Sequence, residues 1–411
     1  MSLEAIKFDR SKTRLDVLDQ LLIPYQTKYI QVSNIDDGYS VIQKMQVRGA
    51  PAIAIVGAFS ITCELHSVKD GQKNTHGYNV SNLPVFKAAL ERRIDNLVKS
   101  RPTAVNLINA CTAVKAIVET ACTIDDLYAE VLRYSVVLFE DDLKNNYRIG
   151  DNGVRYIDNE LSEFEGPFAV MTICNTGSLA TSGHGTALGI IRSLWAKSKA
   201  NPNNADDKTI QGQKSWLSHV YACETRPYNQ GSRLTSYELN FEKIPFSLIT
   251  DNMPAYLIDS LFSQRVNCPL PSRAPVKFII VGADRIVTNG DLANKIGTFQ
   301  LALIASQYEG VKFIGAAPTT TIDYTRDSGD DIVIEQRPAN ELTSILGGQV
   351  DSSDQFVTDS EGKVNLLRVK TATPNIDVWN PAFDVTPNRL IDSIVTEQDY
   401  VVKDSHGKFN L

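Results

Sequence analysis

The feature that most constrains the fold is a series of five short apolar runs in the second half of the 411-residue chain. These runs are FAVMTIC (168–174), HVYACE (219–224), FSLIT (246–250), KFIIVGAD (277–284) and KFIGAAP (312–318). Helical segments or long loops separate them. Strands that are apolar along their whole length are typical of a parallel sheet covered by helices on both faces. The sequence therefore predicts an α/β fold with a Rossmann-like, doubly wound and mostly parallel sheet.

The first part of the chain has a different pattern. Up to residue 125, apolar residues recur at spacings of three and four, as in APAIAIVGAFSITCELHSV and AVNLINACTAVKAIVETA. Such spacing is typical of amphipathic or buried helices. A chain of this length is expected to hold about two domains, at roughly one per 150 residues. We predict a mainly helical N-terminal domain over residues 1–125 and the Rossmann-like domain over 126–411, with a linker helix at about 126–165.

Three polar segments interrupt these patterns, at residues 67–82, 196–214 and 346–367. Their composition buries too little apolar surface to contribute to a packed core. We therefore expect surface insertions that form mobile loops.

Composition excludes several classes of protein. A net charge of −7 argues against binding of nucleic acid through its phosphates. The N-terminus lacks the apolar core of a signal peptide, and no stretch approaches the roughly 18 apolar residues of a membrane span. Five histidines without an HxxxH-type pair predict no metal site. Six cysteines without CxxC spacing are typical of reduced thiols in an intracellular protein. They are Cys63, Cys111, Cys122, Cys174, Cys223 and Cys268.

Every predicted strand ends in polar, small or charged residues, at the edge where open parallel sheets bind their ligands. Cys174 ends the first apolar run and Asp284 ends the fourth. A thiol and a carboxylate at the strand ends of one sheet form a candidate acid/base pair. The alternatives are a buried structural cysteine, and an aspartate that caps a helix or joins an ion pair.

The segment that follows Asp284 holds more polar groups than a surface turn requires: Asn289, Asp291, Asn294 and Lys295. We expect Lys295 in the first turn of the helix that follows. A ligand site would explain this concentration of polar side chains.

The loop after Cys174 is rich in glycine and leads to a helix. Its backbone N–H groups could cradle an anion, and the helix N-terminus would lower the pKa of the thiol. The alternative is a flexible strand-to-helix turn. We expect His184 to stabilise this loop, not to act as a base.

Two arginines of the first domain precede apolar helical segments: Arg48 in QVRGAPAIAIVGA and Arg101 in KSRPTAVNL. Arginine beside a helix N-terminus is a common way to hold phosphate. The alternative for each is a surface arginine.

Five segments together resemble the methylthioribose-1-phosphate isomerase family. They are RGAPAIAIVGA, CNTGSLATSGHGTALGII, ETRPYNQGSRLTSYEL, VGADRIVTNGDLANKIGTFQLA and VWNPAFDVTP. They occur in the family's order along almost the whole chain, and the three insertions indicate a fungal-type member. Enzymes of this family convert 5-methylthioribose 1-phosphate to 5-methylthioribulose 1-phosphate in methionine salvage. The family is related to the regulatory alpha, beta and delta subunits of translation initiation factor 2B.

The resemblance implies a helical N-terminal domain with a small strand hairpin, followed by a Rossmann-like domain, in a homodimer of the cytoplasm and nucleus. It implies acid/base chemistry by Cys174 and Asp284 on a small sugar phosphate, with no metal and no cofactor. No nucleic acid and no membrane partner are implied. The substrate-binding residues that it implies are Arg48, Gly49, Ala50, Arg101, Gln230, Asn294 and Lys295.

Two alternatives share this fold. Non-catalytic regulatory subunits of the guanine-nucleotide exchange factor for translation initiation typically lack the Cys and Asp together, so the presence of both favours an enzyme. Ribose-1,5-bisphosphate isomerase keeps the same pair. A nucleotide-dependent dehydrogenase is disfavoured because the chain has no GxGxxG motif.

Overall fold

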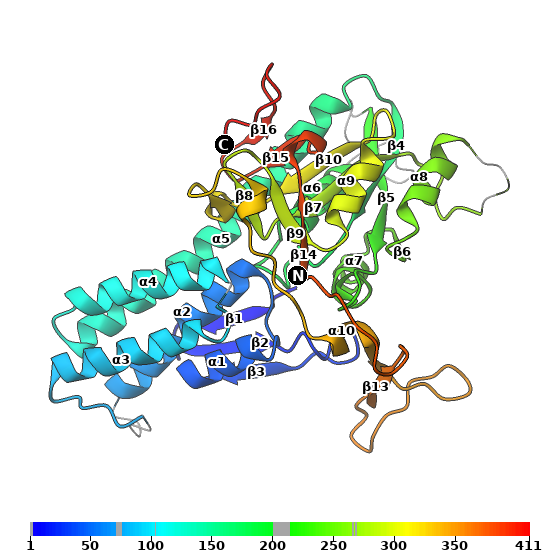
Figure 1. Cartoon of the computed structure of the whole chain (residues 1–411). Coiled ribbons are helices and arrows are strands. Elements are labelled where there is room, and N and C mark those ends of the chain that lie inside the picture. The colour runs from blue at the N-terminus through cyan, green and yellow to red at the C-terminus, as the bar shows by residue number, and fades with distance from the viewer. Residues whose placement is uncertain (1–2, 71–75, 103, 200–213, 265–266, 268) are drawn as a thin grey trace. The chain divides into compact units, whose positions relative to one another are not determined.

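A computed structural model describes residues 3–70, 76–102, 104–199, 214–264, 267 and 269–411 (Figure 1). The chain divides into two compact units. The first contains residues 1–22, 27–145 and 178–185, and the second contains 23–26, 146–177 and 186–411. The division falls within one long helix, α5 (Ile124–Glu160), whereas the sequence pattern placed the domain boundary at residue 125.

The N-terminal unit joins a small sheet to a group of helices. Its antiparallel sheet has the order β1 (Ile6–Asp9), β2 (Arg14–Leu18), β3 (Tyr29–Val32). Its helices are α1 (Ile35–Gln43), α2 (Ala50–Lys69), α3 (Leu83–Val98), α4 (Val105–Thr120) and the first part of α5. Asparagine side chains cap two of them: Asn34 accepts the Asp37 N–H at the start of α1, and Asn82 accepts the Val85 N–H at the start of α3.

Helix α2 is apolar on all sides, and its residues from Ala52 to Leu65 are buried. Among the described residues it alone is long and apolar enough to cross a membrane, by length and composition only. Since 78% of its most apolar window is buried within the structure, α2 has the burial expected of a core helix.

The second unit is built on a seven-stranded sheet with the order β16-β15-β10-β7-β4-β5-β6. In chain order its strands are β4 (Gly166–Thr172), β5 (Ser215–Cys223), β6 (Phe246–Ile249), β7 (Val276–Gly282), β10 (Lys312–Ala316), β15 (Ser393–Val395) and β16 (Tyr400–Val402). Only the β15–β16 pair at the edge is antiparallel. The predicted doubly wound, mostly parallel sheet is therefore confirmed.

Helices cover both faces of this sheet. One face packs Phe168 and Val170 of β4 with residues of α5 and α6 (Ala187–Lys199). The opposite face packs Met171 with residues of α8 (Pro254–Phe262) and α9 (Thr298–Ala305). Burial of successive residues on opposite faces explains why the strands are apolar throughout.

A second, four-stranded sheet follows the end of β7. Its order is β11 (Ile322–Asp323), β8 (Arg285–Val287), β9 (Leu292–Lys295), β14 (Phe383–Thr386). The expectation that Lys295 lies in the first helical turn is wrong, because this residue ends β9 and α9 begins at Thr298. The Asp291 carboxylate accepts the backbone N–H groups of Gly329 and Asn388, at 3.0 and 2.7 Å. Asp291 therefore has a structural function.

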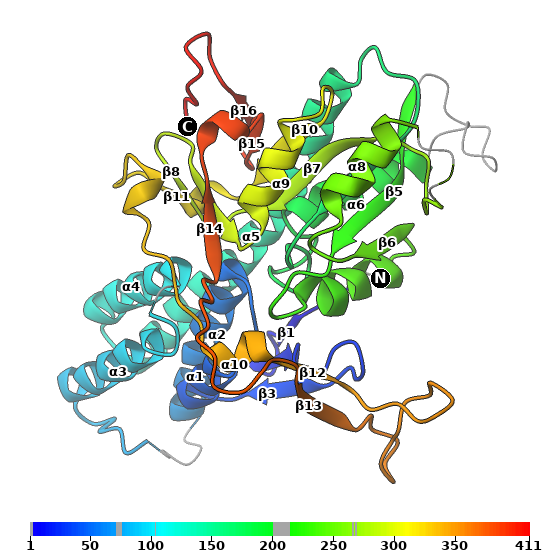
Figure 2. The same cartoon turned by 45° about the vertical axis from the view of Figure 1, so that its right-hand side comes forward.

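The predicted loop at 346–367 is a long β-hairpin (Figure 2). After α10 (Ala339–Thr343), β12 (Ser344–Gly348) pairs with β13 (Leu366–Lys370), and two isolated bridges extend the pairing. Asp351 and Asp359 each accept two backbone N–H groups of the turn that follows them. Polar residues thus order this segment through local hydrogen bonds instead of apolar burial.

The other predicted insertions are described only in part. Segment 67–82 begins inside α2, and residues 71–75 lie outside the described residues. Within 196–214, α6 continues to Lys199, and residues 200–213 lie outside the described residues, as does Cys268. The remaining short helices are a π-helix (Gly231–Thr235), α7 (Ser236–Phe241) and 3-10 turns at Thr319–Thr321, Gly329–Asp331 and Asn388–Leu390.

Candidate active site

Cys174 and Asp284 follow neighbouring strands of the large sheet. Strands β4 and β7 are parallel, with Met171 opposite Ile279, so their carboxyl ends meet at one edge. A Cβ atom on Gly282 would lie 2.7 Å from the Thr176 side chain, so the segment after Cys174 lies directly against the end of β7. The structure therefore brings the thiol and the carboxylate to the same edge. Cys174 is 7% exposed, whereas Asp284 is exposed.

The backbone of Cys174 has an unusual conformation, with φ of 75° in the left-handed region. Its N–H donates to the Thr225 Oγ1 at 2.9 Å, and its carbonyl oxygen accepts from the Thr235 hydroxyl. The residue is held from both sides by threonines that come from other parts of the chain.

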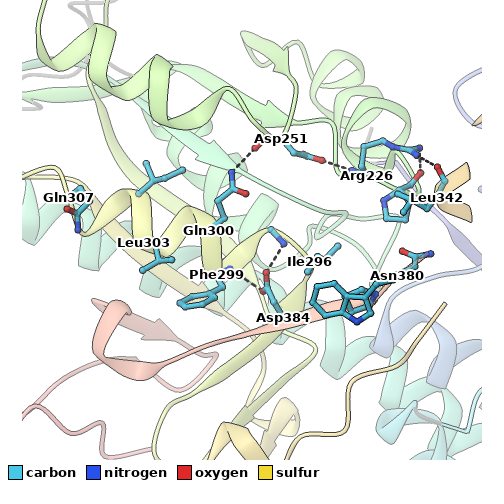
Figure 3. A pocket seen from close by; sticks show the side chains of 15 residues that line it. Arg226, Asp251, Ile296, Phe299, Gln300, Leu303, Gln307, Leu342, Asn380 and Asp384 are labelled. Atoms are coloured by element: carbon cyan, nitrogen blue, oxygen red, sulfur yellow. Dashed lines mark hydrogen bonds between the residues drawn. The ribbon is translucent and has the colours of Figure 1, made fainter. Parts of the chain in front are cut away.

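The carboxyl ends of β5 and β6 are joined in the same way. Thr225, which follows β5, also has a left-handed φ of 63°. The carboxylate of Asp251, which follows β6, accepts the N–H groups of Thr225 at 2.8 Å and of Arg226 at 2.7 Å. The dashed line between Asp251 and Arg226 in Figure 3 marks the second of these bonds. Hydrogen bonds therefore connect the ends of β4, β5 and β6.

Gln230 is buried at the start of the π-helix Gly231–Thr235. Its Oε1 has no hydrogen-bond partner in the part of the chain that the structure describes, and a buried acceptor without a partner is costly. A Cβ atom on Gly231 would lie 1.7 Å from the Cys223 carbonyl oxygen, so only glycine permits this close approach to β5. π-Helical segments are frequent at functional sites, and the unpartnered Gln230 oxygen is a candidate ligand contact.

Asn294 and Lys295 lie on β9 next to β14. The buried Asn294 amide donates to the Thr298 hydroxyl at 3.0 Å. The Lys295 ammonium donates to the Ala382 carbonyl at 2.9 Å and lies 4.5 Å from the centroid of the Phe383 ring. The VWNPAFDVTP motif therefore supports this lysine through β14.

Asp384 on β14 lies opposite Asn294. Its carboxylate accepts the N–H groups of Gly297 at 2.7 Å and Phe299 at 3.1 Å, at the start of α9 (Figure 3). Burial raises the pKa of this carboxyl to about 6, although these hydrogen bonds and the Lys295 charge act in the opposite direction.

The other predicted substrate-binding residues belong to the N-terminal unit. Arg48 is 7% exposed, and Ala50 is the first residue of α2. Gly49 has φ of 96°, and a Cβ atom there would lie 2.0 Å from the Ala180 carbonyl oxygen, so this position requires glycine. Arg101 is half-buried in the turn between α3 and α4, with its N–H bonded to the Val98 carbonyl at 3.2 Å.

The loop after Cys174 is largely buried, so it is not an exposed surface turn. Thr176, Ser178, Thr181 and Ser182 are all buried. Several of the loop's backbone N–H groups already donate within the protein: Ser182 to Asp142, Gly183 to Thr181, Gly185 to Gly183, and Thr186 to Thr176. These four groups are therefore not free to cradle an anion.

Helix α6 begins only at Ala187, and the Thr176 hydroxyl accepts the N–H of Leu188 at 3.2 Å. The start of this helix is therefore bonded to Thr176, in the loop directly after Cys174. That the helix lowers the pKa of the thiol stays a prediction.

Sequence reasoning missed Asn175, which follows Cys174 directly. Its side chain is 7% exposed, and neither its amide nitrogen nor its amide oxygen has a hydrogen-bond partner among the described residues. Buried amides are almost always bonded, so this side chain is a candidate ligand contact. Asparagine is an ordinary loop residue, and the pattern held no signal that would have singled it out.

A cavity of about 780 Å³ lies beside this edge, within the second unit (Figure 3). Its lining comes from the loops after β5 and β6, from α9 and residues on either side of it, from α10, and from β14 and the segment before it. The residues are Arg226, Pro227, Asp251, Ile296, Gly297, Phe299, Gln300, Leu303, Ile304, Gln307, Leu342, Trp379, Asn380, Pro381 and Asp384. None of the predicted site residues lines it. Within the described part of the chain, no group of three or more His, Cys, Asp or Glu residues could hold a metal ion.

The fold and this edge define a doubly wound α/β protein with a thiol, a carboxylate and unpartnered amides beyond its parallel strands. The model of the initiation factor 2 subunit family matches residues 46–401, and the chain belongs to that family. It is 95% identical to the methylthioribose-1-phosphate isomerase of Komagataella phaffii, with both chains covered completely. Its identity to the methylthioribose-1-phosphate isomerase of Candida albicans is 50%, covering 100% of this chain and 98% of that one.

Solved structures show the same fold in an isomerase and in an initiation factor subunit. The 5-methylthioribose 1-phosphate isomerase of Pyrococcus horikoshii matches with a TM-score of 0.73 and 28% identity, covering 97% of this chain and 92% of that one. The translation initiation factor eIF-2B subunit delta of A. fulgidus matches with a TM-score of 0.72 and 30% identity, covering 99% and 98%. The resemblance predicted from five motifs is confirmed.

Proposed function

We propose that this chain isomerises 5-methylthioribose 1-phosphate to 5-methylthioribulose 1-phosphate in methionine salvage. The observation that carries the proposal is the 95% identity to the Komagataella isomerase over the full length of both chains. The position of Cys174 and Asp284 directly after neighbouring parallel strands supports it, since an isomerase needs an acid/base pair at one place.

The chemistry explains why both groups are needed. A phosphate ester on C1 blocks simple opening of the sugar ring, so ring opening needs a proton at the ring oxygen. Hydrogen must then move between C2 and C1, by a phosphoenolate-like intermediate or by a hydride shift. Asp284 supplies the proton to the ring oxygen. Cys174 takes the C2 proton and returns it to C1 in the phosphoenolate route, whereas in the hydride route it takes the proton of the C2 hydroxyl as C2 becomes a carbonyl. Both routes use the same pair.

Substrate binding falls to charged groups, amide groups and backbone at the positions that the family resemblance implies. Arg48 and Arg101 hold the phosphate, because guanidinium groups form paired, charge-assisted hydrogen bonds with phosphate oxygens. Gly49 and Ala50 contribute the backbone at the start of α2. The remaining contacts, from Gln230, Asn294 and Lys295, go to hydroxyls or phosphate.

We also propose that the protein is a homodimer of the cytoplasm and nucleus, as the family resemblance implies. Large apolar side chains are exposed on the second unit at Leu248, Met253, Tyr256 and Phe262, and exposed apolar groups of this kind are typical of an interface between subunits. Light scattering of the purified protein tests the dimer, and imaging of a tagged chain tests the location. A monomer in light scattering would contradict the homodimer. A tagged chain that is excluded from the cytoplasm and the nucleus would contradict the location.

The decisive experiment is turnover of the purified protein with 5-methylthioribose 1-phosphate, in parallel with ribose 1,5-bisphosphate, without added metal or NAD. We expect turnover of the first substrate only. Preference for the bisphosphate would favour the alternative isomerase, and absence of turnover with both would favour a regulatory subunit. The same assay applied to Cys174→Ser should show reduced turnover. Cys111→Ser is its matched control, because Cys111 is a buried thiol of the N-terminal helices.

A further inference from the structure

We propose that Thr225 and Thr235 are positioning residues for Cys174: their hydroxyls hold the peptide groups on both sides of its Cα and thereby set the direction of the thiol. The inference rests on the proposed function, in which Cys174 is the reacting thiol. Neither threonine was among the residues implied by the family resemblance.

The first observation is the backbone conformation. The left-handed region is unfavourable for residues with a Cβ atom, and Cys174 occupies it with φ of 75°. Thr225 occupies it with φ of 63°, although a β-branched residue is rarely found there. Such residues persist only when the surrounding structure holds them, and they cluster at active sites.

The second observation is how the conformation is held. Thr225 Oγ1 accepts the Cys174 N–H at 2.9 Å and donates to the Cys223 carbonyl at 3.1 Å, so its hydroxyl is oriented by two partners. Thr235 Oγ1 donates to the Cys174 carbonyl. One bond holds the peptide group before Cys174 and the other holds the peptide group after it. Together they restrain both backbone dihedral angles of this residue.

The third observation is that the backbone of Thr225 is itself held by hydrogen bonds and that both threonines are buried. Asp251 holds the N–H groups of Thr225 and Arg226, and its own carbonyl accepts from Gln300 at 3.1 Å (Figure 3). Thr225 is 0% exposed and Thr235 is 1% exposed. Hydrogen bonds away from water are stronger than exposed ones, so this arrangement is rigid.

The consequence for catalysis is geometric. The direction of the Cα–Cβ bond follows from the backbone conformation, so a change of φ at Cys174 would move the thiol relative to the substrate. A displacement of about 1 Å can lower a rate by about 100-fold. The threonine hydroxyls would thus act on kcat through Cys174 without contacting substrate.

The test uses Thr225→Val and Thr235→Val, which remove a hydroxyl and keep the shape, with Thr225→Ser and Thr235→Ser as variants that restore it. Thr62→Val is the matched control, because Thr62 is a buried threonine that donates to the Ala58 carbonyl in the core of the N-terminal unit. We expect each valine variant to lower kcat by about 10- to 100-fold with KM changed less than about threefold. The serine variants should recover most of kcat, and Thr62→Val should lower only the melting temperature.

A second readout does not depend on the substrate. This readout is the rate at which iodoacetamide alkylates Cys174, measured on the separated peptides over a range of pH. We expect this rate to change in the valine variants. The exposed Cys122 serves as internal reference, and its rate should stay constant.

The proposal is overturned if both valine variants keep kcat and the Cys174 alkylation rate within about twofold of the wild type, or if Thr62→Val loses kcat equally. If Thr225→Val does not fold, Thr235→Val decides the question alone. Full turnover by Cys174→Ser would instead contradict the catalytic function of Cys174, and alkylation would still report on the two threonines.

Discussion

Replacement of Asp384 by asparagine should change how the stability of the protein depends on pH. The carboxylate of this residue accepts two N–H groups at the start of α9 and lies opposite Asn294 across the β9–β14 pair. Asparagine has nearly the same shape and keeps an acceptor oxygen, but it carries no charge. Its NH2 group replaces one of the two accepting oxygens, and the hydrogen bond that is lost costs about the same at every pH. The pH-dependent part of the change therefore isolates the effect of ionising a partly buried carboxyl.

The sign and magnitude follow from the pKa of this group. Burial raises it from 3.8 to about 6, so the folded state holds the proton more tightly than the unfolded state. The resulting stabilisation is fully present below about pH 4 and is lost as the pH rises through about 6. A shift of about two units corresponds to roughly 3 kcal/mol at most, and partial exposure of the group lowers this to the order of 1–2 kcal/mol.

The assay is urea denaturation of the wild type and Asp384→Asn at several values from about pH 4 to about pH 7. The free energy of unfolding of the variant minus that of the wild type should become more positive with rising pH, by about 1–2 kcal/mol in total. Asp359→Asn is the control, because hydrogen bonds from the hairpin turn lower the pKa of Asp359 from 3.8, so its titration lies below this range and the difference should stay nearly constant. A difference for Asp384→Asn that is flat or falls with pH would refute the reasoning.

Three further predictions concern turnover. Arg48→Ala and Arg101→Ala should each weaken substrate binding by about 1.5–3 kcal/mol per lost charged hydrogen bond, and an unchanged KM in both would contradict their assignment to the phosphate. Asp284→Asn and Cys174→Ser should each lower kcat by roughly 10²–10⁴-fold while a ligand-induced thermal shift persists; near-normal kcat would remove that residue from the acid/base pair. Asn175→Ala should lower kcat/KM by about tenfold or more without lowering the melting temperature, because its amide has no protein partner to lose. A lower melting temperature with normal kcat/KM would indicate a structural amide.

The sequence pattern was sufficient for the large sheet because burial on both faces leaves a local trace. Each of the five apolar runs overlaps a strand, and Cys174 and Asp284 come just after two of these strands. Strands β15 and β16 have three residues each, so their apolar runs are too short to distinguish from loops. The hairpin at 346–367 escaped prediction because side-chain hydrogen bonds in its turns, and not an apolar stripe, order it.

By itself, the sequence determined the class of fold, the edge of the sheet that holds the site and, through its motifs, the family. Tertiary structure alone decided the conformation of that site. The partners that hold Cys174 are Thr225 and Thr235, which lie 51 and 61 residues further along the chain. The left-handed backbone of Cys174, the unpartnered amide of Asn175 and the raised pKa of Asp384 arise from such distant contacts. Local patterns record whether a residue is buried, whereas its hydrogen-bond partners and its electrostatic environment depend on which distant segments pack beside it.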